Sequence, residues 1–288
     1  MSPSPAPNPP AVVADNSAAG LTAQLAEVWD SLAQLGAGLS DAEWQTETPC
    51  PGWSVAAQYA HMIGTESMLL GRPNPEVDPG SPAHVRNQIG GFNEVWVAAL
   101  APRPRGEVLE MFSEVTSERL RALAAMTEDD FSAESWTPVG QADYRRFMQI
   151  RVFDCWVHEQ DIRDALDRPG HGSGPVAEQA VDEIVRAAGY LVGKKAGAPA
   201  GSSVRLQLTG PVERRVDVSV ADGRARVVEA LDGPPVATVT LGSEAFTRLA
   251  CGRVDPAAVL DGGRLGGVVL DGDASLGRRV AESLAFTI

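Results

Sequence analysis

The chain has 288 residues, of which 44% are hydrophobic and 22% are charged, so it is long enough for two globular domains and is neither fibrous nor wholly disordered. Its formal net charge of −14 argues against a nucleic-acid partner, because Lys and Arg must neutralise the phosphates in such complexes. With no apolar run of about 18 residues and three widely spaced cysteines, we expect a cytoplasmic protein without a membrane partner or a disulfide framework.

The first two thirds of the chain predict a helical domain. Residues 1–19 are rich in Pro, Ala, Ser and Asn, and we predict a disordered tail there. Apolar residues then recur every three or four positions from Leu21 to Leu35, which predicts the first helix. Further helices are predicted from Ser54, a suitable N-cap, to about Leu70, and over residues 84–100, 106–126, 143–167 and 174–192. Their lengths predict an up-and-down bundle over residues 20–193.

The pattern changes from helical to alternating after residues 194–202, which we interpret as a linker. Alternating segments predict strands of one antiparallel sheet, with a turn at Asp222 and Gly223, over residues 203–210, 214–220, 223–230 and 237–242. A helix capped by Ser243 and stopped by Gly252, a short strand and a last helix complete a small α+β domain over residues 203–288. The expected fold class is α + α/β with two domains.

The bundle contains a candidate metal site. Asp154 and His158 are four residues apart in a predicted helix, so their side chains share one face. A carboxylate and an imidazole at this spacing can hold a divalent metal, and a third ligand from another helix, for which His61 is the candidate, would give the arrangement of catalytic zinc. A histidine on an apolar helix face is more often a packed, hydrogen-bonded core residue than a ligand, although the interleaved Phe153 and Trp156 indicate a buried helix whose polar groups need partners.

Both domains resemble one known family. The helical domain resembles the mycothiol-dependent maleylpyruvate isomerase family, one of the DinB-like metal-binding bundles, in TPCPGWSVAAQYAHMIGTE, RNQIGGFNEVWVAAL and RVFDCWVHEQDIRDALDRPG. The second domain is similar to that family's sterol-carrier-like domain in ATVTLGSEAFTRLACGRVDP and in the strand and helix that follow. The resemblance implies that His61, Asp154 and His158 hold a divalent metal, with Zn²⁺ the first candidate, and that mycothiol is the cosubstrate. The enzyme that names the family has Glu where this sequence has the shorter Asp154, so we expect a metal nearer the helix backbone or a bridging water.

The predicted function is thiol-dependent catalysis at that metal. A metal-bound thiolate can act as cis–trans isomerase or S-transferase on a small electrophilic substrate. The thiol is expected to come from outside, and Cys50 and the other two cysteines are interpreted as small core residues. The candidate catalytic groups for an anionic substrate are Arg86, Arg151 and Arg163, although an ion pair with a neighbouring acid explains each of them as well.

A non-catalytic alternative stays open at this point. In it, the chain binds a small ligand or a partner, and its metal site is structural or vestigial. The Asp in place of Glu favours this alternative, whereas two buried histidines favour the enzyme. We expect a monomer or a homodimer. His84 and His171 are predicted to be exposed, and Trp53 and Trp156 are predicted to fill the bundle core.

Overall fold

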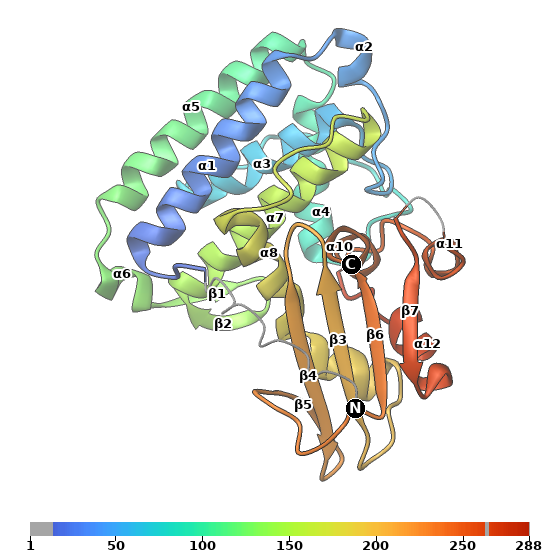
Figure 1. Ribbon diagram of the computed structural model, residues 1–288. Coiled ribbons are helices and arrows are strands. Elements are labelled where there is room, and N and C mark those ends of the chain that lie inside the picture. Colours follow the sequence, from blue (N-terminus) through green and yellow to red (C-terminus); the bar gives the residue numbers. More distant parts are fainter. Residues whose placement is uncertain (1–13, 263–264, 288) are drawn as a thin grey trace. The chain divides into compact units, whose positions relative to one another are not determined.

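The computed structural model describes residues 14–262 and 265–287, and the chain forms two compact units, Asp15–Glu183 and Ile184–Thr287 (Figure 1). The first unit is mainly helical and the second contains a sheet. The predicted tail over residues 1–13 lies outside the described residues. Within the described part of the chain, no helix combines the length and the apolar character needed to cross a membrane.

Five helices make up most of the first unit: α1 (Ala18–Ala37), α3 (Val55–Leu69), α4 (Gln88–Leu100), α5 (Arg105–Ala124) and α7 (Tyr144–Ala165). Helix α1 packs chiefly on α5 and α7, whereas α3 packs on α4 and α5. Consecutive long helices α1 and α3 are therefore not close neighbours, and the predicted up-and-down order is wrong. The 17-residue connection between them, which includes α2 (Asp41–Trp44), is long enough to let the chain cross the bundle.

Helix starts follow side-chain caps that the sequence offers. Ser54 caps α3 by accepting a hydrogen bond from the Ala57 amide, as predicted. Ser17 caps α1, so that helix begins at Ala18, three residues before the prediction, and residues 14–19 are not part of a disordered tail. Asp143 caps α7 by accepting from the Arg146 amide, and this cap fixes the start of the helix that bears two candidate ligands.

Short elements of the first unit were not predicted. They are α6 (Glu128–Ser132) and a two-stranded hairpin formed by β1 (Glu134–Thr137) and β2 (Gly140–Asp143). Each is four or five residues long, too short for a hydrophobic period to repeat.

The second unit is built on a five-stranded sheet of order β5-β4-β3-β6-β7. Its strands are β3 (Ser203–Thr209), β4 (Arg214–Ala221), β5 (Arg224–Val228), β6 (Ala237–Gly242) and β7 (Val268–Gly272). Strands β3 and β6 pair in parallel, so the predicted purely antiparallel sheet is wrong. The turn between β4 and β5 is as predicted, because Asp222 and Gly223 both have positive φ, at 51° and 71°. The parallel pair forms because the chain returns after β5 and places β6 on the far side of β3.

Three helices follow β6 in the described part of this unit. They are α10 (Ser243–Ala250), α11 (Pro256–Leu260) and α12 (Ala274–Glu282), and α10 and α12 both pack on β6. Ser243 does not cap α10 as predicted. Gly242 is the cap residue, and the Ser243 hydroxyl instead accepts a hydrogen bond from the Val212 amide at 3.3 Å.

The two units divide within α8 (Pro175–Arg186), about ten residues before the predicted linker at 194–202. After α8 come α9 (Ala188–Tyr190) and a π-helix (Leu191–Lys195), both of which pack on β5. The approach is close, since a Cβ on Gly189 would lie 2.7 Å from the carbonyl oxygen of Ala225. These helical residues therefore belong to the sheet unit, and a continuous helical pattern in the sequence concealed the division.

Candidate metal centre

The structure brings His61, Asp154 and His158 together, as predicted. His61 comes from α3, and Asp154 and His158 lie one turn apart on α7. His61 Nε2 is 3.0 Å from Asp154 Oδ2, and His158 Nε2 is 3.6 Å from Asp154 Oδ1. One ligand atom from each residue lies within 4.8 Å of those of the other two. We call these three residues the trio.

Helix α3 buries His61 because it lies in the middle of the bundle. Thirteen consecutive residues, from Val55 to Ser67, are buried, so the helix has no solvated face over this stretch. Close packing depends on small residues: a Cβ on Gly64 would lie 2.4 Å from Trp96 Cγ. His61 is only 4% exposed as a result.

Trp53 covers both imidazoles of the trio. Its ring centroid lies 5.0 Å from that of His61 and 5.4 Å from that of His158. The indole Nε1 donates to Glu94 Oε1 at 2.6 Å, and His84 Nε2 lies 2.7 Å from the same oxygen. Trp53 therefore contacts the trio directly in addition to filling the core, and the buried Glu94 fixes its orientation. His84 is half-buried rather than exposed, since its side chain is 27% accessible.

Arg151 fixes the carboxylate of Asp154 from within the protein. It is 2% exposed, donates to Asp154 Oδ2, and donates from Nε to Glu66 Oε1 at 2.9 Å. Glu66 is fully buried and also accepts from Arg119 Nε at 2.9 Å. Arg151 thus contacts the carboxylate of the trio and is almost completely buried. Neither Glu66 nor Arg119 was singled out from the sequence, because an acid one turn after His61 and a distant Arg give no local signal.

The electrostatics of the trio favour an anionic carboxylate between two imidazoles. Burial would raise the pKa of Asp154, but Arg151 and both histidines hold that pKa well below its usual value. Burial lowers the pKa of His61 and leaves a neutral ring with a lone pair. For His158, burial lowers the pKa, but Asp154 and Asp161 together outweigh this effect, and the net result is a raised pKa.

The donor set fits a divalent metal. Zinc takes carboxylate oxygen and imidazole nitrogen at about 2.0–2.2 Å, so ligand atoms around it lie about 3.3–3.6 Å apart. The separations of 3.0 and 3.6 Å in the trio are close to this range. His61 Nδ1 and His158 Nδ1 are buried and have no hydrogen-bond partner among the described residues. The shorter Asp154 side chain still reaches His61, at 3.0 Å from its Nε2.

Comparison with known proteins covers both units. The family model of the mycothiol maleylpyruvate isomerase N-terminal domain matches residues 25–163, and the model of the C-terminal domain of the same family matches residues 178–279. The chain belongs to the mycothiol-dependent maleylpyruvate isomerase family. Its fold is similar to the crystal structure of the mycothiol-dependent maleylpyruvate isomerase, with a TM-score of 0.55 and 17% identity over 88% of this chain and 92% of that one.

Two curated relatives match part of the chain. The uncharacterized proteins Rv0036c and MT0041, both of Mycobacterium tuberculosis, are 28% identical over 152 residues, which is 48% of this chain and 52% of theirs. The chain thus spans about half the length of the curated relatives that it matches.

The other predicted site residues of this family member lie apart from the trio. Arg163 donates from Nε to Glu159 Oε1 at 2.8 Å and from Nη2 to the Ser31 hydroxyl at 3.1 Å. His171 was predicted to be exposed, and this is wrong: its side chain is 12% accessible and its Nδ1 lies 2.6 Å from Glu159 Oε2. Arg86 is exposed in the loop before α4, two residues after His84.

A buried thiol lies beside the trio but is not a nucleophile. Cys155 is fully buried, and burial raises the pKa of its thiol to about 12. Trp29 Nε1 and Arg151 Nη2 donate to its sulfur at 3.4 and 3.2 Å. The prediction of a core residue is confirmed for Cys155 and also for Cys251, which is 3% exposed, whereas Cys50 is half-buried.

Proposed function

We propose that this chain is a metal-dependent enzyme that uses mycothiol on a small electrophilic substrate, as a cis–trans isomerase or an S-transferase. The observation that supports it most is the convergence of His61, Asp154 and His158 within 4.8 Å, in a chain of the maleylpyruvate isomerase family. Imidazole nitrogen and carboxylate oxygen are ligands that Zn²⁺ accepts, and three protein ligands leave a position open. Zn²⁺ is therefore the proposed cation.

The cation would lower the pKa of an incoming thiol and stabilise its thiolate near neutral pH. The residues of the chain would prepare this step. The neutral His61 ring offers a lone pair, and Arg151 holds Asp154 ionised and in place. Trp53 covers one side of both imidazoles and excludes water there.

The two reactions would differ in what happens after the thiol adds to the substrate. In isomerisation, the sulfur bonds to one carbon of a double bond, the remaining single bond rotates, and elimination returns the thiol. In S-transfer, the carbon–sulfur bond is kept and one thiol is consumed per turnover. Arg86 is the proposed contact for an anionic substrate, because it is exposed and follows His84, whose ring packs against Gly52 next to Trp53.

Metal content of the purified full chain tests the site. We expect about one equivalent of bound metal in the wild type and a loss of most of it in His158→Ala. His84→Ala is the matched control, since it removes an imidazole that contacts Glu94 and not the trio, and should retain the metal. Less than about 0.2 equivalents in the wild type, unchanged in His158→Ala, would refute the site.

Turnover tests the chemistry. Zinc-loaded protein is incubated with mycothiol and with maleylpyruvate or a panel of small electrophiles. Isomerised product without thiol loss identifies the isomerase, and stoichiometric thiol loss identifies the S-transferase. Absence of both, with the metal bound, would contradict the proposed catalysis and favour a ligand-binding protein.

A further inference from the structure

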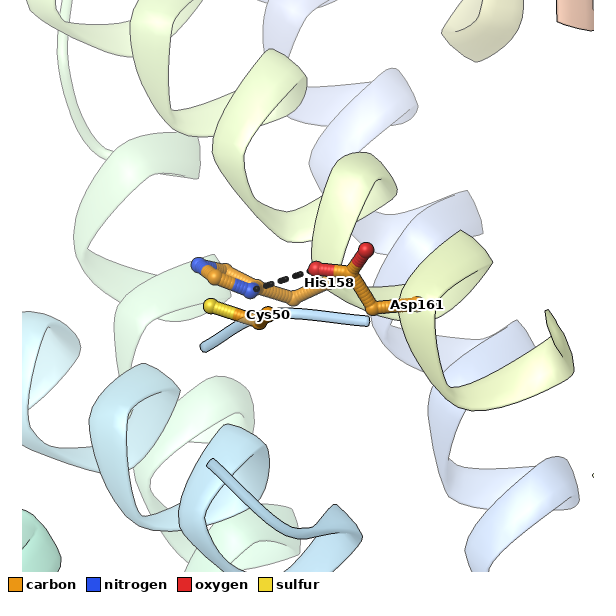
Figure 2. A group of neighbouring side chains, drawn as sticks. All are labelled: Cys50, His158 and Asp161. Atoms are coloured by element: carbon orange, nitrogen blue, oxygen red, sulfur yellow. Dashed lines mark ion pairs between the residues drawn. The ribbon is translucent and has the colours of Figure 1, made fainter. Parts of the chain in front are cut away.

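A second group of metal-ligand atoms lies against the other edge of His158. Cys50, His158 and Asp161 each present one ligand atom within 4.8 Å of the other two. His158 Nδ1 is 3.5 Å from Asp161 Oδ2, whereas Nε2 of the same ring faces Asp154. Figure 2 shows the sulfur of Cys50 beside the imidazole ring and the Asp161 carboxylate facing Nδ1. The two nitrogens of one ring therefore face two different carboxylates.

His158 Nδ1 and Asp161 Oδ2 form an ion pair whose 3.5 Å separation is longer than an ordinary hydrogen bond and matches two ligands of one cation. An N–H···O bond is about 2.7–3.2 Å long, and Nδ1 has no hydrogen-bond partner in the part of the chain that the structure describes, although His158 is 6% exposed. Buried imidazole nitrogens normally have a partner. Two ligands of one tetrahedral zinc lie about 3.3–3.6 Å apart, which includes the observed 3.5 Å.

The backbone around Cys50 fixes the position of its sulfur. The Cys50 amide donates to the Thr48 hydroxyl at 3.3 Å, and the Cys50 carbonyl accepts from the Trp53 amide at 3.1 Å. Gly52, between them, has φ of +79°, a conformation that closes this tight turn and that favours glycine. Cys50 is half-buried as a whole residue, and within the group of three ligand atoms it is buried like His158 and Asp161.

The three donors suit a thiophilic cation. A thiolate and a carboxylate together carry two negative charges, which a divalent cation neutralises, and the imidazole adds a neutral donor. Sulfur ligands select Zn²⁺ and similar soft cations over Mg²⁺ or Ca²⁺. Asp161 is 2% exposed, so water would screen little of the attraction between its carboxylate and a bound cation.

We propose that Cys50, His158 and Asp161 form a second binding site for a thiophilic divalent cation, and that this site competes with the trio for His158. A neutral imidazole has one lone pair, which can point to Nδ1 or to Nε2 but not to both. A cation at Nδ1 thus withdraws His158 from the trio. The binding at this second site stands without the proposed function, whereas the competition rests on the metal proposed there for the trio.

Cadmium titration of the metal-free full chain tests the site, because a cadmium–thiolate bond has an ultraviolet charge-transfer absorption that nitrogen and oxygen ligands do not give. We expect this band in the wild type, its loss in Cys50→Ser, and at least about tenfold weaker binding in Asp161→Asn. Cys155→Ser and Cys251→Ser are the controls and should keep the band, since both cysteines are buried and neither belongs to the group of Cys50, His158 and Asp161. A wild type without the band, or a band that survives in Cys50→Ser, would overturn the proposal.

A cadmium titration of a trio variant tests the competition for His158. His61→Ala weakens the trio and leaves every donor of the second site in place. The cadmium concentration at half-maximal band intensity should therefore fall, by about tenfold, relative to the wild type. An unchanged or raised concentration, in a protein whose metal content shows the trio to be occupied, would show that the two sites do not share His158. The measurement needs no turnover, so its outcome is independent of whether the proposed enzyme activity is found.

Discussion

Helix α7 contributes to two clusters of imidazoles and carboxylates that differ in how completely they are paired. The trio of His61, Asp154 and His158 converges on one point, and the Nδ1 atoms of both histidines have no hydrogen bond to any described residue. The other cluster lies around His171, and both nitrogens of that ring face carboxylates, at 2.6 Å from Glu159 and 3.2 Å from Glu27.

In the cluster around His171, both carboxylate oxygens of the buried Glu159 also have polar partners. Glu159 Oε1 accepts from the Ser31 hydroxyl at 2.6 Å and from Arg163 Nε at 2.8 Å, while Oε2 faces His171. We call Ser31, Glu27, Glu159, Arg163 and His171 the clamp. Acids and histidines close together are thus not sufficient to indicate a ligand site. The stronger sign is a set of side chains whose ligand atoms converge and whose other buried nitrogens lack hydrogen bonds, because a structural network satisfies its own members.

Replacing the arginine of each cluster should lower the unfolding free energy by different amounts. Arg151→Met leaves Asp154 and the fully buried Glu66 each without one cationic partner, and we expect a loss of about 3–5 kcal/mol of unfolding free energy. Arg163→Met should cost less, about 1–3 kcal/mol, since Glu159 keeps Ser31 and His171. Urea unfolding of the metal-free variants measures both. An equal or smaller loss in Arg151→Met would contradict the proposed importance of the buried pair.

Substituting one histidine in each cluster by asparagine should show which cluster binds the metal and which has only a structural role. His61→Asn removes a ligand of the trio, and we expect the metal affinity to fall by on the order of 100-fold or more. His171→Asn changes only the clamp and should leave the affinity within about threefold of the wild type. Asn tolerates the positive φ of 52° at position 171, so the loop is not strained. Competition with a chromophoric chelator measures both affinities, and a comparable loss in both variants would refute the distinction.

The sequence predicted the trio better than the clamp for a physical reason. Asp154 and His158 are fixed relative to each other by helix geometry alone, and the family resemblance added His61 from another helix. The clamp depends on His171 in a loop folding back onto α7 and α1, which no local period encodes. The sequence therefore misplaced His171 as exposed and proposed Arg163 for the active site.

In the sheet unit, too, local sequence patterns predict the elements but not how distant elements pair. Strand positions and the Asp222-Gly223 turn follow from local alternation and turn chemistry, and both were confirmed. The parallel pairing of β3 with β6 depends on where the chain returns after β5, which is a non-local choice. Glu94 and Glu66 were missed for a related reason: each is an acid whose partners come from distant helices or loops.

The clamp should make stability depend on pH. Burial lowers the pKa of His171, but Glu159 and Glu27 outweigh it and raise that pKa above its usual 6.5. A raised folded-state pKa stabilises the fold fully below the unfolded-state value and loses this contribution as pH rises through the folded-state value. The difference in unfolding free energy between wild type and His171→Asn should therefore be largest near pH 6 and shrink toward about pH 9. A difference independent of pH would contradict a protonated His171.

The smallest expected effects come from the tryptophan of each cluster. Trp53 Nε1 donates to Glu94 at 2.6 Å and its ring covers both imidazoles of the trio, whereas Trp156 Nε1 donates to the His171 carbonyl at 2.7 Å. Each Trp→Phe substitution removes one hydrogen bond and should cost about 1 kcal/mol. Trp53→Phe should also speed metal release by about two- to fivefold, because the smaller ring covers the ligands less well. Stopped-flow release into excess chelator measures this rate. Faster release in Trp156→Phe as well would show that general loosening of the bundle, and not the cover over the trio, controls how long the metal stays bound.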